Sequence, residues 1–212
     1  MIIGLSGLIG SGKNTAASLI KEAYPEKHFE NLSFARTLKD AVSVMFGWDR
    51  KMLEGDTNES RNFRITPDSF WSDKFGYQVT PRGILQKFGN EAKNYFCEDF
   101  WLASGVQRVI EHNPDKNFLI TDVRYPDEIK YLTSVGALLI EVQRGEEPEW
   151  YYQAKRVNKG EANIDEFPLL KNIHVSEWKW VGLIPNKVYN NGTLEHLQEQ
   201  LTALIVKHCQ EK

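Results

Sequence analysis

A glycine-rich segment near the N-terminus, GLIGSGKNT at residues 7–15, limits most strongly what this chain can fold into. It follows an apolar run at residues 1–5 and opens a helical pattern at residues 15–23. A strand, a glycine-rich loop and a helix in this order are typical of a phosphate-binding loop. The segment predicts an α/β domain with a phosphate site at the end of its first strand. The alternative is a glycine-rich turn that binds nothing.

The residue types in this loop suit the phosphates of ATP. Glycines let successive amide groups point at phosphate oxygens, and the helix N-terminus adds about half a positive charge. Lys13 adds a full charge that can follow the transferring phosphoryl group, and the Thr15 hydroxyl is a candidate metal ligand. Asn14 stands where the strict pattern has Ser or Thr. The candidate ATP-binding residues of the loop are Gly10, Ser11, Gly12, Lys13, Asn14 and Thr15.

Composition favours small-molecule chemistry in a single domain. The chain has 212 residues, of which 41% are hydrophobic and 26% charged, and its net charge is −3. No overall positive field therefore favours polymeric nucleic acid or an anionic membrane. The two cysteines, Cys97 and Cys209, lack metal-type spacing. No basic leader precedes the first strand pattern and no apolar run approaches the roughly 20 residues of a membrane span, so we expect a cytoplasmic protein.

Apolar runs with strand character alternate with helical patterns along the chain. This alternation predicts a five-stranded, mostly parallel sheet flanked by helices. Helix starts are expected at Thr80 with Pro81, at Asp127 and at Thr193, and Gly136 is expected to stop the second of these helices. The five strand-like runs lie at residues 1–5, 29–34, 117–121, 137–142 and 187–189.

Two stretches do not follow this alternation. Residues 49–79 are rich in polar and aromatic side chains, and residues 145–187 carry charges and several tryptophans without a clear period. We interpret the first as a substrate-side insertion and the second as a mobile lid. Both would belong to one P-loop domain that spans residues 1–212.

A second polar cluster follows the apolar run FLI at residues 118–120. Asp122 can hold Mg²⁺ or contact an acceptor, because acids at this strand end lie beside the phosphate loop in P-loop folds. Arg124 suits a bidentate grip on phosphate, and Glu128 completes an Asp-x-Arg-x-x-x-Glu pattern. The alternative is a structural ion pair between Asp122 and Arg124, with Glu128 as a first-turn acid that complements the helix dipole.

The predicted helix at residues 80–91 has a polar face that can meet a ligand. Arg82 and Gln86 share this face and could hold an acceptor's phosphate and base. Gly83 and Gly89 each cost about 1 kcal/mol in a helix, so close approach of a ligand or another backbone is expected there. The alternative is a solvated face with incidental glycines.

Four segments together resemble the bacteriophage deoxynucleoside monophosphate kinases, in order and approximate spacing, over most of the chain. They are GLIGSGKNT, FARTLKDA at residues 34–41, PRGILQKFG at residues 81–89 and DVR at residues 122–124. The resemblance implies a nucleoside monophosphate kinase fold, Mg-ATP as donor, and host cytoplasm as location if the protein is viral. It implies an acceptor site formed by Lys39, Arg82, Trp101, Asp122, Arg124 and Glu128, although Trp101 alone reads equally well as a core residue.

The resemblance also bears on the second half of the chain. Arg144 and Arg156 are the available lid arginines, with solvated loop arginines as the alternative. HVSE at residues 174–177 looks like a family feature, and Asn190 lies in a turn that borders the adenine in similar kinases. Phage members can carry basic residues where this chain has Ile9 and Gly10, so the neutralisation of the acceptor phosphate and the accepted bases stay open.

The expected reaction is in-line transfer of the terminal phosphoryl group of ATP to a deoxynucleoside monophosphate. Mg²⁺ bridges the ATP phosphates, Lys13 and a lid arginine, with Arg144 preferred, neutralise developing charge, and Arg82 and Arg124 hold the acceptor. One alternative is a P-loop kinase for another small phosphorylated acceptor, such as phosphomevalonate or dephospho-coenzyme A. Another is an ATP-hydrolysing switch. Ribose selectivity and a homodimer stay open at this stage.

Overall fold

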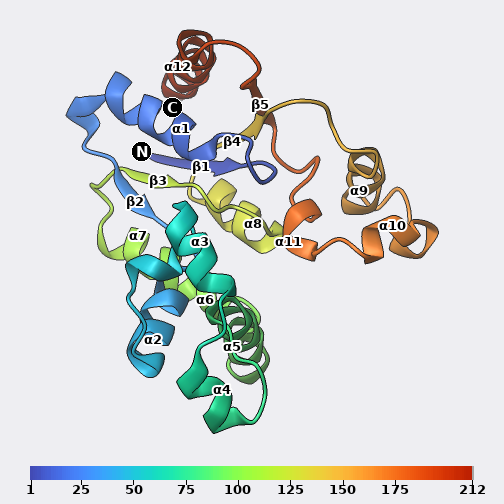
Figure 1. The fold of residues 1–212 in the computed structure, drawn as a ribbon. Helices are drawn as coiled ribbons and strands as arrows, with labels where there is room; N and C mark the ends of the chain where they lie inside the picture. The colour runs from blue at the N-terminus through green and yellow to red at the C-terminus, as the bar shows by residue number, and fades with distance from the viewer. Residues whose placement is uncertain (212) are drawn as a thin grey trace. The chain divides into compact units, whose positions relative to one another are not determined.

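The computed structural model describes residues 1–211, which form two compact units. Unit 1 holds residues 1–32 and 113–211, and unit 2 is Ser33–His112 (Figure 1). The predicted insertion at residues 49–79 falls in unit 2, whereas the predicted lid at residues 145–187 falls in unit 1. No helix of the described residues has the length and apolar character needed to span a membrane.

Unit 1 is built on a five-stranded sheet in which every pairing is parallel, in the order β2-β3-β1-β4-β5. The central strand β1 pairs with β3 and β4, so that Ile3 lies beside both Leu119 and Leu138. The predicted five-stranded sheet is confirmed. The strands are β1 (Ile2–Ser6), β2 (Glu30–Leu32), β3 (Phe118–Ile120), β4 (Leu138–Gln143) and β5 (Asn186–Tyr189).

Helices cover both faces of this sheet. Successive residues of β1 face opposite sides of it and contact different helices. Ile3 and Leu5 pack in one buried cluster with residues of α1 (Lys13–Ala23) and α12 (Leu194–Gln210). Gly4, between them, faces Leu132 of α8 (Pro126–Ser134) on the other side. A short 3-10 turn, Pro25–Lys27, links α1 to β2.

The segment between β4 and β5 is largely helical. It contains α9 (Tyr151–Asn158), a 3-10 turn at Ile164–Glu166, α10 (Pro168–Lys171) and α11 (Val175–Trp178). Two of its tryptophans, Trp178 and Trp180, are buried. This part of the predicted lid therefore has a packed interior.

Unit 2 is helical and has its own core. Buried residues of this core include Val42, Trp48, Leu53 and Ile84. Its helices are α2 (Arg36–Phe46), α3 (Asn58–Ile65), α4 (Ser69–Phe75), α5 (Pro81–Tyr95), α6 (Phe100–Leu102) and α7 (Arg108–His112), with a 3-10 turn at Lys51–Leu53 and a π-helical turn at Ala103–Gln107.

The predicted helix boundaries are mostly confirmed. The side chains of Thr80 and Thr193 accept hydrogen bonds from first-turn amides of α5 and α12, as expected of N-caps. Gly136 follows α8 with a φ of 69°, which suits a glycine stop. The predicted cap at Asp127 is wrong, because α8 begins at Pro126. Proline favours the first helical position, since it needs no amide partner there.

Candidate active site

The loop between β1 and α1, residues 7–12 and here called the cradle, has a backbone that requires glycine at three positions. Gly7, Gly10 and Gly12 have φ values of 145°, 80° and 96°. A Cβ atom on Gly7 would lie 2.3 Å from the Val142 carbonyl oxygen, and one on Gly12 would lie 2.2 Å from the Asn190 amide nitrogen. No side chain caps α1 and no acid lies in its first turn. The helix N-terminus therefore suits an anion.

Lys13, the first residue of α1, folds back over the cradle. Its Nζ donates to the carbonyl oxygens of Gly7 and Leu8, at 2.8 and 2.9 Å. Burial, reinforced by the nearby charge of Arg124, lowers the pKa of Lys13 from 10.5 to about 8. Asp122 and Glu177 oppose this lowering. The structure thus brings two cations and two acids to one place.

Asn190 ties the turn after β5 to the cradle. Its side-chain nitrogen donates to the Ser11 carbonyl oxygen at 3.0 Å, and its backbone N–H donates to the Gln143 carbonyl oxygen at 2.7 Å. The Ser11 hydroxyl is buried and has no hydrogen-bond partner among the described residues. Asn190 thus holds the loop through Ser11, and its predicted place beside the adenine stays a prediction.

The segment after β3 is joined to the end of β1. The Ser6 hydroxyl donates to the Val123 carbonyl oxygen at 2.7 Å, where both groups are buried. Asp122 and Arg124 flank Val123 and therefore lie at the edge of the sheet where the cradle begins. In open α/β sheets, ligands bind at this carboxyl end of the strands.

Arg124 forms an ion pair with a residue that is distant in sequence. Its Nη1 donates to Glu177 Oε1 of α11 at 2.9 Å. Glu177 was not predicted as a site residue, although it belongs to the HVSE segment that the sequence singled out. That segment was the only signal that could have found it.

Glu128 is buried and accepts hydrogen bonds from the backbone of the loop before α8. Only 7% of the residue is exposed, and its Oε2 accepts the backbone N–H groups of Arg124 at 2.6 Å and Tyr125 at 3.0 Å. Burial, followed by the charge of Asp122, raises the pKa of Glu128 to about 8. The carboxyl group thus shapes the loop that carries Arg124.

Two oxygen donors of the site fit Mg²⁺. Thr15 is exposed on the first turn of α1, and Asp122 is close enough to Lys13 for its charge to be felt there. Mg²⁺ prefers oxygen ligands and is commonly held by one or two protein groups together with substrate phosphates. Thr15 and Asp122 supply oxygen atoms of this kind, and their role as metal ligands stays a prediction.

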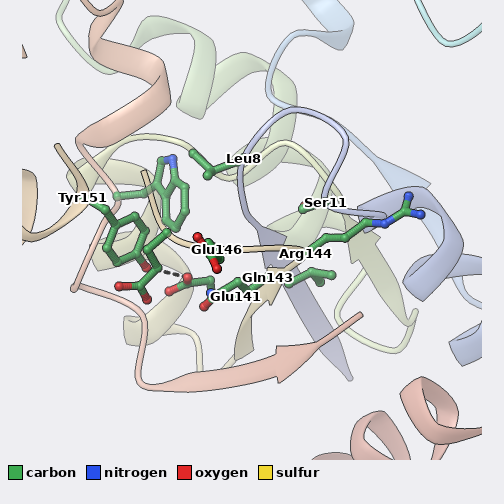
Figure 2. Close-up of a pocket in the computed structure, with 10 residues that line it drawn as sticks. Leu8, Ser11, Glu141, Gln143, Arg144, Glu146 and Tyr151 are labelled. Atoms are coloured by element: carbon green, nitrogen blue, oxygen red, sulfur yellow. Dashed lines mark hydrogen bonds between the residues drawn. The ribbon is translucent and has the colours of Figure 1, made fainter. Parts of the chain in front are cut away.

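Arg144 lies at the end of β4, beside a small cavity (Figure 2). The side chain is exposed and extends away from the carboxylates of Glu141 and Glu146. The cavity measures about 10 Å³, which is no more than one water molecule requires. It is too small for a nucleotide base.

The remaining predicted acceptor residues belong to unit 2. Lys39 forms an ion pair with Glu54 at 2.5 Å. Arg82 and Gln86 are exposed on α5, as expected. Trp101 is 7% exposed, and its Nε1 donates to the Gly89 carbonyl oxygen at 2.7 Å, so this residue packs in the unit. The close neighbour of Gly89 is Leu38, whose Cδ2 would lie 3.2 Å from a Cβ atom at that position.

Arg156, the second lid arginine, lies on α9 of unit 1. Its guanidinium carbon is 5.7 Å from the centre of the Phe167 ring. This distance is within the range of a cation–π contact. Arg156 thus has a partner within the segment between β4 and β5.

Two viral proteins are similar to this chain in sequence. A protein of Acanthamoeba polyphaga mimivirus, named as a deoxynucleotide monophosphate kinase, is 32% identical over 157 residues, which covers 68% of this chain and 74% of that protein. The deoxynucleoside-5′-monophosphate kinase of Escherichia phage T5 is 25% identical over 187 residues, which covers 65% of this chain and 74% of the phage protein. No protein-family model matches the chain.

Two solved structures align with nearly the whole chain at low similarity. A Thermus thermophilus protein gives a TM-score of 0.47 at 15% identity, covering 98% of this chain and 97% of that one. The dephospho-CoA kinase of Campylobacter jejuni gives 0.41 at 11% identity, covering 98% and 96%. Both scores are below 0.5 and add nothing to the topology described above.

Proposed function

This chain belongs to the deoxynucleoside monophosphate kinase family, and on that premise we propose that it transfers the γ-phosphoryl group of ATP to a deoxynucleoside 5′-monophosphate. The products are ADP and the deoxynucleoside diphosphate. One observation carries the proposal: the uncapped N-terminus of α1 and Lys13 lie beside Asp122 and Arg124 at the carboxyl end of a parallel sheet. That set contains a place for a donor phosphate and a cation for an acceptor phosphate.

The donor side is the cradle. Its amides bind the ATP phosphates, and Lys13 exchanges the carbonyl oxygens of Gly7 and Leu8 for phosphate oxygens. Mg²⁺, when bound, would neutralise charge on the nucleotide phosphates, and Thr15 and Asp122 are the residues that would hold it. Asn190 holds the loop through its hydrogen bond to the Ser11 carbonyl oxygen.

The acceptor side is organised around Arg124. A guanidinium group can hold two oxygens of a monophosphate at once and so orient the attacking oxygen. The acceptor phosphate is already an anion, so no strong general base is needed. Lys39, Arg82, Gln86 and Trp101, the other predicted acceptor residues, stay predictions from the sequence.

The segment at residues 145–187 is proposed to act as a lid, with Arg144 at its start. Closure would expel water, and an arginine then stabilises the charge that spreads over the transferred group. Glu128 contributes indirectly, because it binds the backbone of the loop that carries Arg124.

The direct test is ADP production from Mg-ATP with a panel of acceptors. We expect acceleration by at least one of dAMP, dCMP, dGMP and dTMP, with the ribonucleotides measured beside them. Lys13→Ala should reduce the rate by about 100-fold or more, the effect typical of losing one preorganised group that stabilises transition-state charge. Phosphomevalonate and dephospho-coenzyme A belong in the same panel. Acceleration by one of these alone, or by no acceptor at all, would contradict the proposed function.

A further inference from the structure

The ion pair between Arg124 and Glu177 connects the site to the segment between β4 and β5. The two residues are 53 positions apart in sequence, and their contact is a single hydrogen bond through Nη1. Both side chains are partly shielded from water, with 33% of Arg124 and 22% of Glu177 exposed. A pair in this setting is screened less than one on the open surface. It can therefore fix a side-chain orientation.

Glu177 is carried by an anchored segment. Asn158 donates through its side-chain nitrogen to the carbonyl oxygens of Trp178 and Val181, at 2.8 and 2.9 Å. Trp178 is buried, and the His174 ring accepts from the backbone N–H of Ser176. The carboxylate of Glu177 is thus presented by a backbone held on both sides of it.

Arg124 is in turn held at both of its ends. Glu128 binds its backbone N–H at 2.6 Å, and Glu177 binds Nη1 of its guanidinium at 2.9 Å. Arginine has five N–H donors in a planar fork, so one contact leaves donors for a bidentate ligand. The charge of Glu177 also acts on Lys13, whose pKa it raises, whereas the charge of Arg124 lowers that pKa.

We propose that Glu177 is a positioning residue, whose carboxylate orients the Arg124 guanidinium so that its free edge grips the acceptor's phosphate. The inference rests on the proposed function and deepens its acceptor site. Two other roles make different predictions. A carboxylate that merely competes with phosphate would weaken acceptor binding, and a purely structural pair would affect stability alone.

Kinetics of Glu177→Gln separate these roles. Glutamine keeps the size of the side chain and removes the charge that holds the guanidinium. Positioning predicts a loss of roughly 10- to 100-fold in kcat/KM for the deoxynucleoside monophosphate, since small misplacements of reacting groups cost up to that much. At pH 6, well below the Lys13 pKa of about 8 that Glu177 helps to keep up, the KM for ATP should stay within about twofold. Glu161→Gln is the matched control, because Glu161 is an exposed acid of the same segment.

A double-mutant cycle tests whether Glu177 acts through Arg124. Arg124→Ala alone should be strongly impaired, and Arg124→Ala with Glu177→Gln should be no worse, because the second change then has nothing left to orient. Additive losses would overturn the proposal. So would a lower acceptor KM in Glu177→Gln, or a change in thermal unfolding without any kinetic change.

One readout does not need turnover. In the free protein, the NMR signals of the Arg124 guanidinium should show restricted rotation, and Glu177→Gln should average them while Glu161→Gln does not. A wild-type protein that is inactive on every monophosphate but shows this difference would contradict the proposed function and not the orienting contact. Identical signals in wild type and Glu177→Gln would overturn the role of Glu177 itself.

Discussion

At the scale of single residues, Lys13 is the cation of the site whose charge depends most on its surroundings. Its ammonium group donates to two backbone carbonyl oxygens, and burial with the nearby Arg124 lowers its pKa to about 8. A lysine in water would keep its proton to much higher pH. The charge that should meet the nucleotide phosphates is therefore lost within an accessible pH range.

The pH dependence of kcat/KM for ATP should show this loss. Lys13 binds phosphate in its protonated form, so kcat/KM should fall above pH 8 and approach a tenfold decrease per pH unit. Lys13→Arg should start from a lower plateau and show no such decrease up to pH 9.5, because arginine stays protonated. A wild-type profile that remains flat to pH 9.5 would contradict the assignment.

Glu128 has a raised pKa, in contrast to Lys13, and this shift predicts how the stability of the protein depends on pH. Its pKa is raised from 4.5 to about 8, so between these values the folded protein keeps a proton that the unfolded chain releases. The free energy of unfolding should therefore fall as pH rises through this window. Glu128→Gln cannot titrate, so its profile should be flatter than that of wild type, by at least about 1 kcal/mol between pH 5 and 8.

Urea unfolding at pH 5, 6, 7 and 8 measures this difference. Glu149→Gln is the control, since Glu149 is exposed. Lys13 does not interfere, because wild type and Glu128→Gln both contain it and its contribution, a rise in stability from about pH 8 toward pH 10.5, cancels in the comparison. Parallel profiles for wild type and Glu128→Gln would show that the buried carboxyl group is ionised throughout the window.

At the scale of elements, local chemistry determined what could be predicted. Thr80 and Thr193 cap their helices with their own hydroxyl groups, and such signals lie within a few residues of each other. Asp127 was mistaken for a cap because Pro126 already serves as the first helical residue. The sequence of α9, α10 and α11 has no clear helical period. Trp178 and Trp180 of this segment are buried, so its structure depends on tertiary packing.

Some residues of the candidate site could be predicted from the sequence and others could not. Lys13, Asp122 and Arg124 could be grouped from sequence, because each follows a strand and the carboxyl ends of neighbouring parallel strands share one edge of the sheet. The partner of Arg124 could not be derived by such a rule. Glu177 reaches it from another part of the chain through tertiary packing. The acceptor residues of unit 2 stay predictions.

Asn158 joins α9 to the last residue of α11 and to Val181 beyond it, and removal of its side chain tests these two contacts. Asn158→Ala leaves the carbonyl oxygens of Trp178 and Val181 without this partner. We expect a loss of about 1–3 kcal/mol in stability, since the buried Val181 carbonyl oxygen then loses this donor, whereas the Trp178 carbonyl oxygen keeps the Val181 backbone N–H at 3.0 Å. Amide hydrogen exchange at residues 175–181 should become faster, whereas the exposed control Asn172→Ala should leave it unchanged. Equal exchange in both variants would show that α11 is held by other contacts.

At the scale of the whole molecule, unit 1 buries charge at one end of its sheet. Glu141 of β4 is only 3% exposed and accepts a hydrogen bond from the Tyr151 hydroxyl. Lys187 of β5 lies 3.0 Å from the same carboxylate and 2.9 Å from Glu147. Buried carboxylates are costly unless paired, so this network links the stability of two strands and α9.

Lys187→Met should therefore destabilise unit 1 as a whole. Glu141 would keep its burial but lose its cation, and we expect a cost of about 3 kcal/mol, near the lower end for broken buried pairs because Lys187 reaches solvent. Adding Glu141→Gln should recover much of that loss, since a neutral amide has little charge to desolvate. Lys159→Met, at an exposed lysine of the same segment, is the control. Urea unfolding followed by circular dichroism measures each variant, and a Lys187→Met cost no larger than that of Lys159→Met would mean that water, and not Lys187, compensates Glu141.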